Sequence, residues 1–110
     1  MRAYESWEGT YEIARIRRLS KNIYVIEAQK KVDKHNIKGV EITFFAGEDN
    51  SNLEKVLREP DKLIGKKLKL RKPKHDFDII AEVKMGILSK YYIRNGGTEV
   101  AKTWRWIRKA

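Results

Sequence analysis

The chain contains no cysteine. Disulfide bonds, thiolate zinc sites and cysteine nucleophiles are therefore excluded, and we expect a cytoplasmic, non-secreted protein in a reducing compartment. The sequence also lacks any apolar run close to the ~20 residues that a membrane-spanning helix requires. We therefore predict a soluble protein with no membrane partner.

Proline is scarce, and low-complexity tracts, internal repeats and Gly/Ser linkers do not occur. The two prolines, Pro60 and Pro73, punctuate the chain without dividing it. A chain of 110 residues with 41% hydrophobic residues can bury one core without a metal or a disulfide. The sequence therefore predicts one domain over residues 1–110.

Acidic residues are few relative to basic ones, which outnumber them 25 to 15 and give a formal net charge of +10. A surplus of this size on a small domain attracts polyanions, and nucleic acid is the commonest of them. The single glutamine, Gln29, and the abundance of isoleucine, lysine and glutamate are typical of hyperthermophile proteins, which indicates an archaeal or viral source.

β-Branched and aromatic residues predict an N-terminal hairpin, formed by residues 10–18 and 22–29. The apolar alternation slips within the first of these strands. Ile13 and Ile16 can share a face only if an extra residue lies between them, which predicts a β-bulge.

The middle of the chain combines a lysine-rich segment with alternating apolar residues. We expect residues 30–38 to form a loop and residues 40–45 to form a third strand, with Phe45 on its polar face. A capping box and a narrow apolar stripe predict a short α-helix at about residues 51–58. A fourth strand, residues 67–71, would have a wholly cationic outer face.

The C-terminal third is predicted to be β-structure. Residues 77–85 alternate as a fifth strand whose core face includes Ile79, Ala81 and Val83. Asn95-Gly96 lies between two strand-like segments, 87–94 and 98–107, and Asn-Gly is a strong signal for a tight hairpin turn. We therefore predict a C-terminal β-hairpin added to the sheet.

The predicted order of three strands, one short helix and two strands resembles the OB-fold, a five-stranded barrel. The resemblance covers residues 10–86 and rests on element order. It implies a mainly β domain, an OB-like β-barrel that binds oligonucleotides, with the C-terminal hairpin as an addition. An SH3-like barrel and an irregular α+β sheet are the alternatives.

Seven of the thirteen residues in the segment 62–74 are basic, and none is acidic. Along a strand and the loop that follows it, such groups can track phosphates, and each neutralised phosphate releases counterions. The alternative is a solvated edge strand protected from aggregation by lysine. The cations are Lys62, Lys66, Lys67, Lys69, Arg71, Lys72 and Lys74.

A second basic group lies at the end of the first strand and in its turn. In the OB-fold that this chain resembles, the first loop contacts the ligand, which implies a binding role for the group. Alternatively, Arg15 and Arg17 cover apolar surface with their stems and pair with Glu12 or Glu27 through their guanidinium groups. The group comprises Arg15, Arg17, Arg18 and Lys21.

Aromatic residues near the C-terminus alternate with cations. Bases stack on such rings with about 1–3 kcal/mol each, while neighbouring cations hold the backbone. Trp104 and Trp106 share one face of a strand, and the alternative is that both are core residues. The predicted nucleic-acid-binding residues are Arg15, Arg17, Arg18, Lys21, Phe45, Lys66, Lys67, Lys69, Arg71, Lys72, Lys74, Tyr92, Arg94, Trp104, Arg105 and Trp106.

Enzymatic patterns are sparse. His35 and His75 lie in lysine-rich segments with no second histidine nearby, so we predict no metal site and no cofactor. One pattern, Pro60-Asp61 followed by Glu82-Val83-Lys84, has the form found in restriction-type nucleases, in which carboxylates hold Mg²⁺. We favour the alternative, in which Asp61 caps a turn and Glu82 and Lys84 are ordinary neighbours on one face of a strand. The residues of such a nuclease site would be Asp61, Asp78, Glu82 and Lys84.

These features predict a non-enzymatic protein that binds single-stranded DNA or RNA with little sequence preference. Three alternatives stay open: a duplex DNA-binding chromatin or regulatory protein, a viral or plasmid-type inhibitor that docks on an acidic protein, and the magnesium-dependent nuclease. An exposed edge strand at residues 98–107 could also pair two copies into a homodimer.

Overall fold

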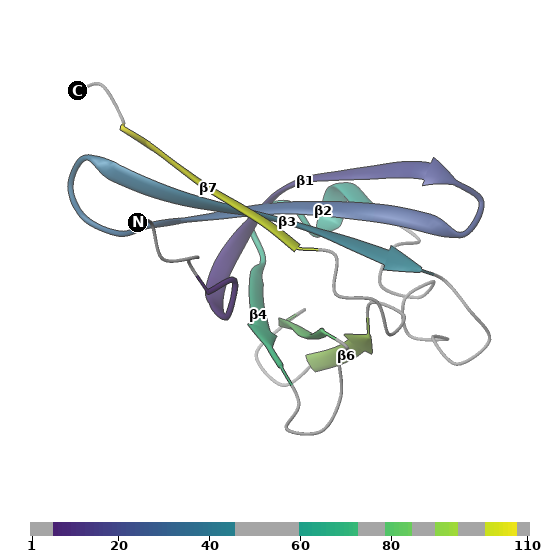
Figure 1. Ribbon diagram of the computed structural model, residues 1–110. Helices are drawn as coiled ribbons and strands as arrows, with labels where there is room; N and C mark the ends of the chain where they lie inside the picture. The colour runs from purple at the N-terminus through teal and green to yellow at the C-terminus, as the bar shows by residue number, and fades with distance from the viewer. Residues whose placement is uncertain (1–5, 46–59, 73–78, 85–89, 95–100, 108–110) are drawn as a thin grey trace.

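The computed structural model describes residues 6–45, 60–72, 79–84, 90–94 and 101–107, which form seven strands and one turn of 3₁₀-helix. In Figure 1, β1, β2 and β3 run as long strands across the view, with β7 crossing them and β4 and β6 below. The elements are β1 (Gly9–Ser20), β2 (Ile23–Lys31), β3 (Asn36–Phe45), η1 (Pro60–Lys62), β4 (Lys67–Arg71), β5 (Ile80–Lys84), β6 (Lys90–Arg94) and β7 (Ala101–Ile107).

The seven strands form one antiparallel sheet in the order β6-β5-β4-β1-β2-β3-β7. The central strand, β1, pairs with β4 over residues 9–12 and with β2 over residues 12–20. The mainly β class is therefore confirmed. The predicted OB-like barrel is wrong, because β6 and β7 end the order and no pairing joins them within the described residues.

The predicted bulge in β1 is confirmed. Ile13 pairs with Ala28 and Arg15 pairs with Glu27, so Ala14 is the extra residue. The bulge restores the alternation, because Ile16 pairs with Ile26 and packs against the core that buries Ile13. It lies just beyond the point where β1 changes partners.

The predicted loop at residues 30–38 is wrong, because β2 continues to Lys31 and β3 begins at Asn36. Lys30 pairs directly with Lys38 in this extension of the hairpin. The backbone hydrogen bonds of a sheet form whether or not the side chains are apolar, so lysines do not prevent this extension. Lys38 is itself buried, with only 7% of its surface exposed. Its ammonium group donates a hydrogen bond to the Ser6 carbonyl.

The alternation predicted for the fourth and fifth strands is confirmed. In β4, Leu68 and Leu70 are buried, whereas the three cationic residues between and beside them are exposed. Ile79 and, in β5, Ala81 and Val83 are buried on the core face. The predicted helix at residues 51–58 lies outside the described residues, among which no α-helix occurs.

The predicted C-terminal hairpin is wrong, because β6 pairs with β5 and β7 pairs with β3. The two strands therefore lie at opposite ends of the sheet order. An Asn-Gly turn favours pairing of its flanking strands, but here β6 pairs with its other neighbour in sequence, β5, and β7 pairs with the more distant β3. The turn itself lies outside the described residues.

The core lies on the inner face of the sheet, where both halves of the strand order contribute buried side chains to one cluster. Tyr11 is buried there, and its hydroxyl donates a 2.9 Å hydrogen bond to the Trp7 carbonyl. None of the described segments is a helix with the length and apolar character needed to cross a membrane. The cluster contains Trp7, Tyr11, Ile13, Ile26, Ala28, Val40, Ile42, Phe44, Leu63, Leu68, Leu70, Ile79, Ala81 and Val83.

Candidate nucleic-acid interface

The face of the sheet opposite the core, which we call the outward face, carries most of the candidate residues. One row of paired residues crosses it from β4 to β7, and paired residues of antiparallel strands project to the same face. The row therefore brings together a cation, polar groups and an aromatic ring from five strands. It consists of Lys67, Glu12, Gln29, Gly39 and Trp104.

The cations of β4 lie together on the outward face. Lys67, Lys69 and Arg71 are exposed and alternate with buried leucines. Lys69 pairs with Glu82, which in turn pairs with Tyr92. Tyr92 is 51% exposed, so the structure places a large exposed ring in the same row as a β4 lysine.

Trp104 lies against the backbone of β3. It pairs with Gly39, and a Cβ atom at Gly39 would lie 2.5 Å from the indole Nε1. Glycine is therefore the residue that lets the ring rest on the strand. Trp104 nevertheless remains 38% exposed, and this arrangement holds the ring at the surface.

The basic group at the β1–β2 turn is divided between the two faces. On the outward face, Arg17 Nη2 lies 2.8 Å from Glu41 Oε1 and 3.4 Å from Glu27 Oε1, so the alternative reading of Arg17 as an ion-pair partner is confirmed. Arg18 pairs with Tyr24 and lies 5.6 Å from the centre of its ring. Arg18 therefore lies on the other face from Arg17.

The remaining members of this group do not form one cluster with β4. Arg15 is exposed and pairs with Glu27 in the sheet register. Lys21 is exposed in the turn between β1 and β2, at the far end of the hairpin. Arg18 also donates hydrogen bonds of 3.2 Å to the carbonyls of Ser20 and Lys21, which ties it to its own turn.

The other predicted residues are scattered. Phe45 is half-buried and pairs with Ile23. Lys66 is half-buried, and its carbonyl accepts a 2.9 Å hydrogen bond from the Ile13 amide, whereas Lys72 is exposed. Arg105 is exposed and pairs with Lys38, on the face opposite Trp104.

For two further predicted residues the structure describes only the backbone, and a third lies outside the described residues. Arg94 pairs with Ile80 and Trp106 pairs with Ile37 in the sheet register, which fixes their backbone positions. Lys74 lies outside the described residues.

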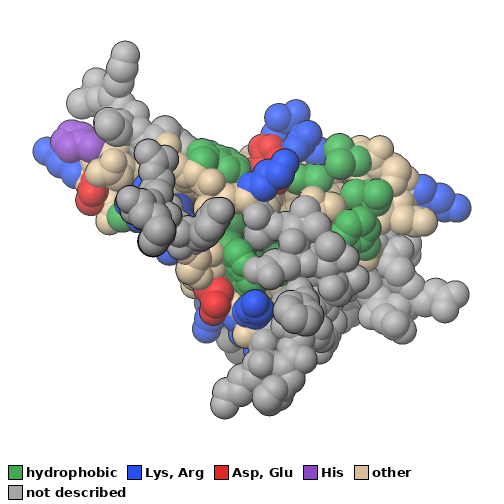
Figure 2. Space-filling model, in the orientation of Figure 1, with side chains coloured by type: hydrophobic (Ala, Val, Ile, Leu, Met, Phe, Trp, Pro, Cys, Tyr) green, Lys and Arg blue, Asp and Glu red, His purple; other side chains and the backbone are tan. Residues whose placement is uncertain are grey.

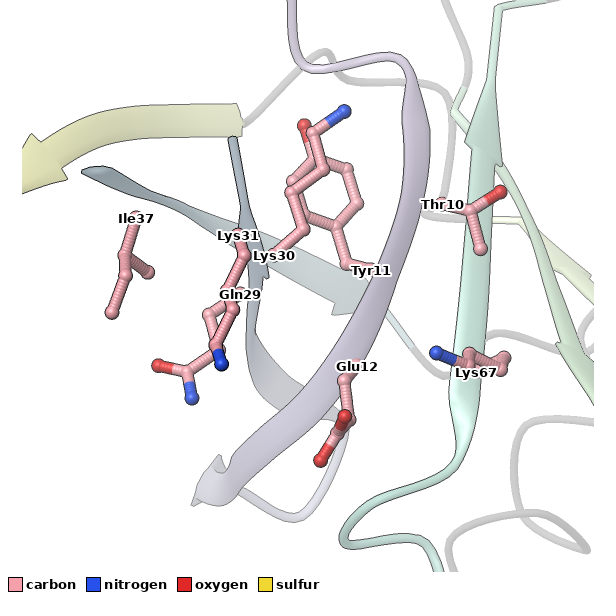
Figure 3. Close-up of a pocket in the computed structure, with 8 residues that line it drawn as sticks. All are labelled: Thr10, Tyr11, Glu12, Gln29, Lys30, Lys31, Ile37 and Lys67. Atoms are coloured by element: carbon pink, nitrogen blue, oxygen red, sulfur yellow. The ribbon is translucent and has the colours of Figure 1, made fainter. Parts of the chain in front are cut away.

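A pocket of about 490 Å³ opens where β1 leaves β2 to pair with β4. This pocket was not predicted from the sequence, although the lysine-rich segment 30–38 indicated a local excess of positive charge. Figure 3 shows the lining side chains around the diverging strands. They are Thr10, Tyr11, Glu12, Gln29, Lys30, Lys31, Ile37 and Lys67.

Lys30 crosses the gap between β2 and β1. Its Nζ lies 4.9 Å from the centre of the Tyr11 ring, and Figure 3 shows its stem running beside that ring. A Cβ atom at Gly9 would lie 2.9 Å from the same Nζ, and Gly9 has a φ of 141°, which side chains rarely adopt. Gly9 therefore leaves room for the ammonium group beside β1.

The β2–β3 turn is organised by Asp33. The side-chain amide of Asn36 and the backbone amides of His35 and Asn36 donate hydrogen bonds to its carboxylate at 2.7–2.9 Å. These bonds, with a smaller contribution from the charge of Arg105, hold the pKa of Asp33 below its usual value of 3.8. The turn therefore presents an anchored carboxylate in a fixed position.

The described residues of the nuclease pattern lie in separate elements, η1 and β5. Asp61 is exposed in η1, Glu82 is half-buried in β5, and Asp78 lies outside the described residues. In the described segments, no three histidine, aspartate or glutamate side chains gather as a metal site would require.

Figure 2 shows basic side chains in several groups, at the two ends of the long strands and near their middle, where an acidic side chain lies among them. Comparison of the chain with protein-family models, curated proteins and solved structures finds no match. What the outward face can bind is therefore inferred from its own residues.

Proposed function

We propose that this protein binds single-stranded nucleic acid through its outward face, without catalysis and with little sequence preference. The observation that carries the proposal is the combination on that face of the exposed β4 cations with two exposed rings, Trp104 and Tyr92. Cations bind phosphates, and unpaired bases can stack on any aromatic ring that has one accessible face. Bases in a duplex are already stacked, which is why the rings favour a single strand.

We also propose an OB-like relationship that concerns strand order and pairing alone, because the described sheet is not closed into a barrel. The support for it is the strand β1, which pairs with both β2 and β4, and the placement of three strands before η1 and two directly after it. Oligonucleotide binding is common on sheets of that type.

The first experiment is a fluorescence titration with single-stranded and duplex oligonucleotides of equal length. Contact with about four phosphates gives a salt slope of about −2.8 for a single strand, which is about a 50-fold loss of affinity between about 50 and 200 mM salt. We expect tighter binding of the single strand and quenching of tryptophan emission. Tighter duplex binding would contradict the single-strand preference, and failure of both forms to bind at low salt would overturn the proposal in favour of an acidic protein partner.

Matched lysine variants locate the interface. Lys69→Gln removes a cation from the proposed face, and Lys21→Gln removes one from the far turn. We expect Lys69→Gln to weaken binding and to reduce the salt slope by about 0.7, the value for one phosphate contact. Lys21→Gln should change neither quantity, and equal effects of the two variants would argue for non-specific attraction by net charge alone.

A further inference from the structure

The pocket beside β1 has a charge that matches a specific anion. Its lining includes three lysines and one glutamate, so its formal charge is +2. A phosphate monoester carries a charge of about −1.5 to −2 at pH 7, whereas an internal phosphodiester of a nucleic-acid strand carries about −1. The volume of about 490 Å³ also lies in the range of pockets that hold one small ligand.

The inner face beside the pocket adds a row of like charges. Lys30 pairs with Lys38, and Lys38 pairs with Arg105. Like charges directly opposite one another destabilise a sheet, and here the ammonium of Lys38 is further fixed by the Ser6 carbonyl. An anion bound near Lys30 would offset this repulsion.

Donors and a ring lie next to the pocket in the sheet register. Thr10 and Gln29 can each donate a hydrogen bond to a phosphate oxygen. Gln29 pairs with Gly39, against which Trp104 rests, so the ring lies about one strand spacing, ~4.8 Å, beyond the Gln29 side of the pocket. A phosphate in the pocket would place its attached nucleotide near that ring.

We propose that this pocket binds a phosphate monoester, the terminal phosphate of a nucleic-acid strand. Lys30, Lys31 and Lys67 neutralise the dianion, while the base of the terminal nucleotide stacks on Trp104. The inference rests on the proposed function, because it assigns the end of the same bound strand. It differs from that function in requiring recognition of a chemical group that internal nucleotides lack.

The test compares oligonucleotides of one sequence that carry a 5′-phosphate, a 3′-phosphate or no terminal phosphate. Hydrogen bonds to a charged group predict roughly tenfold tighter binding of one phosphorylated form at low salt. Because the second pKa of the phosphate is about 6, lowering the pH from about 7.5 to 5.5 protonates most of the dianion and should reduce this preference.

Neighbouring lysines of β4 supply matched variants. Lys67→Gln removes a pocket lysine and should abolish the preference for a terminal phosphate, as should Lys31→Gln. Lys69→Gln, two residues along β4 and outside the pocket lining, should weaken all three oligonucleotides equally and preserve their ratio. Loss of the ratio in Lys69→Gln as well would contradict a localised site.

The possible outcomes separate the two proposals. Equal binding of all three oligonucleotides would overturn the terminal-phosphate site and leave the proposed function intact. Binding of a free mononucleotide or of inorganic phosphate, lost in Lys67→Gln, without binding of any oligonucleotide would overturn the proposed function and support the pocket as a site for free phosphate monoesters. If none of the three oligonucleotides, the mononucleotide or inorganic phosphate binds, both proposals are overturned.

Discussion

Two glycines show how single residues set the surface chemistry of this sheet. Gly9 leaves space for the ammonium of Lys30, and Gly39 leaves space for the indole of Trp104. Each absent Cβ therefore allows a long side chain from a neighbouring strand to lie against the backbone. At Gly39 this close approach, rather than an unusual backbone angle, is what requires glycine.

The close approach at Gly39 predicts that the effect of Gly39→Ala on the free energy of unfolding changes sign when Trp104 is removed. Gly39→Ala in the native protein should lower the free energy of unfolding by about 1–3 kcal/mol, because the new methyl group displaces the indole. In a Trp104→Ala background the same substitution should raise it by about 0.5–1 kcal/mol, because alanine is better than glycine in a strand. Urea unfolding of the four proteins measures both values.

That double-mutant cycle isolates the contact between the two residues. It also bears on binding, since a displaced ring would no longer be held on the outward face. A Gly39→Ala change that costs the same in both backgrounds would show that the indole does not rest on β3.

At the scale of elements, the β2–β3 turn predicts a dependence on pH. Asn36→Ala removes the largest cause of the lowered Asp33 pKa, so the pKa should move up towards 3.8. Since the folded pKa lies below the unfolded value, the ionised carboxylate stabilises the turn above about pH 3.8, and this contribution is lost as the pH falls through the folded pKa. A carboxyl-carbon NMR titration measures the change.

A neighbouring lysine gives the control for this titration. Lys34 is exposed in the same turn and is not among the groups that shift Asp33. Lys34→Gln should therefore leave the Asp33 titration in place. An Asp33 carboxyl that titrates at or above 3.8 in the native protein would contradict the hydrogen-bonded turn.

The elements also show what the sequence could predict. The bulge at Ala14 and the cationic face of β4 were predictable, because each depends on the spacing of apolar residues within one strand. The extension of the β2–β3 hairpin was missed because Lys38 occupies an inward position that the alternation of Val40 and Ile42 assigns to an apolar side chain. The charged side chain at position 38 interrupts the apolar alternation, so the pattern did not predict that the strand begins before Val40.

Partner choice between distant strands was beyond local patterns. The Asn95-Gly96 signal describes a turn, but it carries no information on whether β7 prefers β6 or β3. For the same reason, exposure of Trp104 was predictable only as one of two alternatives, and its contact with Gly39 was not. That contact exists because β7 pairs with β3 in one particular register.

Considered as a whole, the molecule carries a net charge of +10 on 110 residues. Some of its cations are offset locally, as Arg17 is by Glu41 and Glu27. Others are placed in register with one another, as in the row of Lys30, Lys38 and Arg105. Self-repulsion of this kind destabilises a compact state, and a bound polyanion relieves it.

The net charge predicts opposite effects of salt on the free and bound protein. Screening should raise the melting temperature of the free protein between about 20 and 200 mM salt, because it weakens the repulsion. Stabilisation by a single strand should fall over the upper part of that range: at a ligand concentration of about 100 Kd it is about 2.7 kcal/mol, and a 50-fold weaker Kd reduces it to about 0.6 kcal/mol.

Thermal unfolding followed by circular dichroism, with and without the oligonucleotide, measures both trends, which should converge at high salt. Melting temperatures of the free protein that decrease with salt would show that attraction within ion pairs such as Arg17–Glu41 exceeds the repulsion among the remaining cations. The bound protein would then lose stability with salt for two reasons at once. Convergence of a rising and a falling curve is therefore the result that identifies an unbalanced positive charge as both a cost to the free fold and the basis of its attraction for a polyanion.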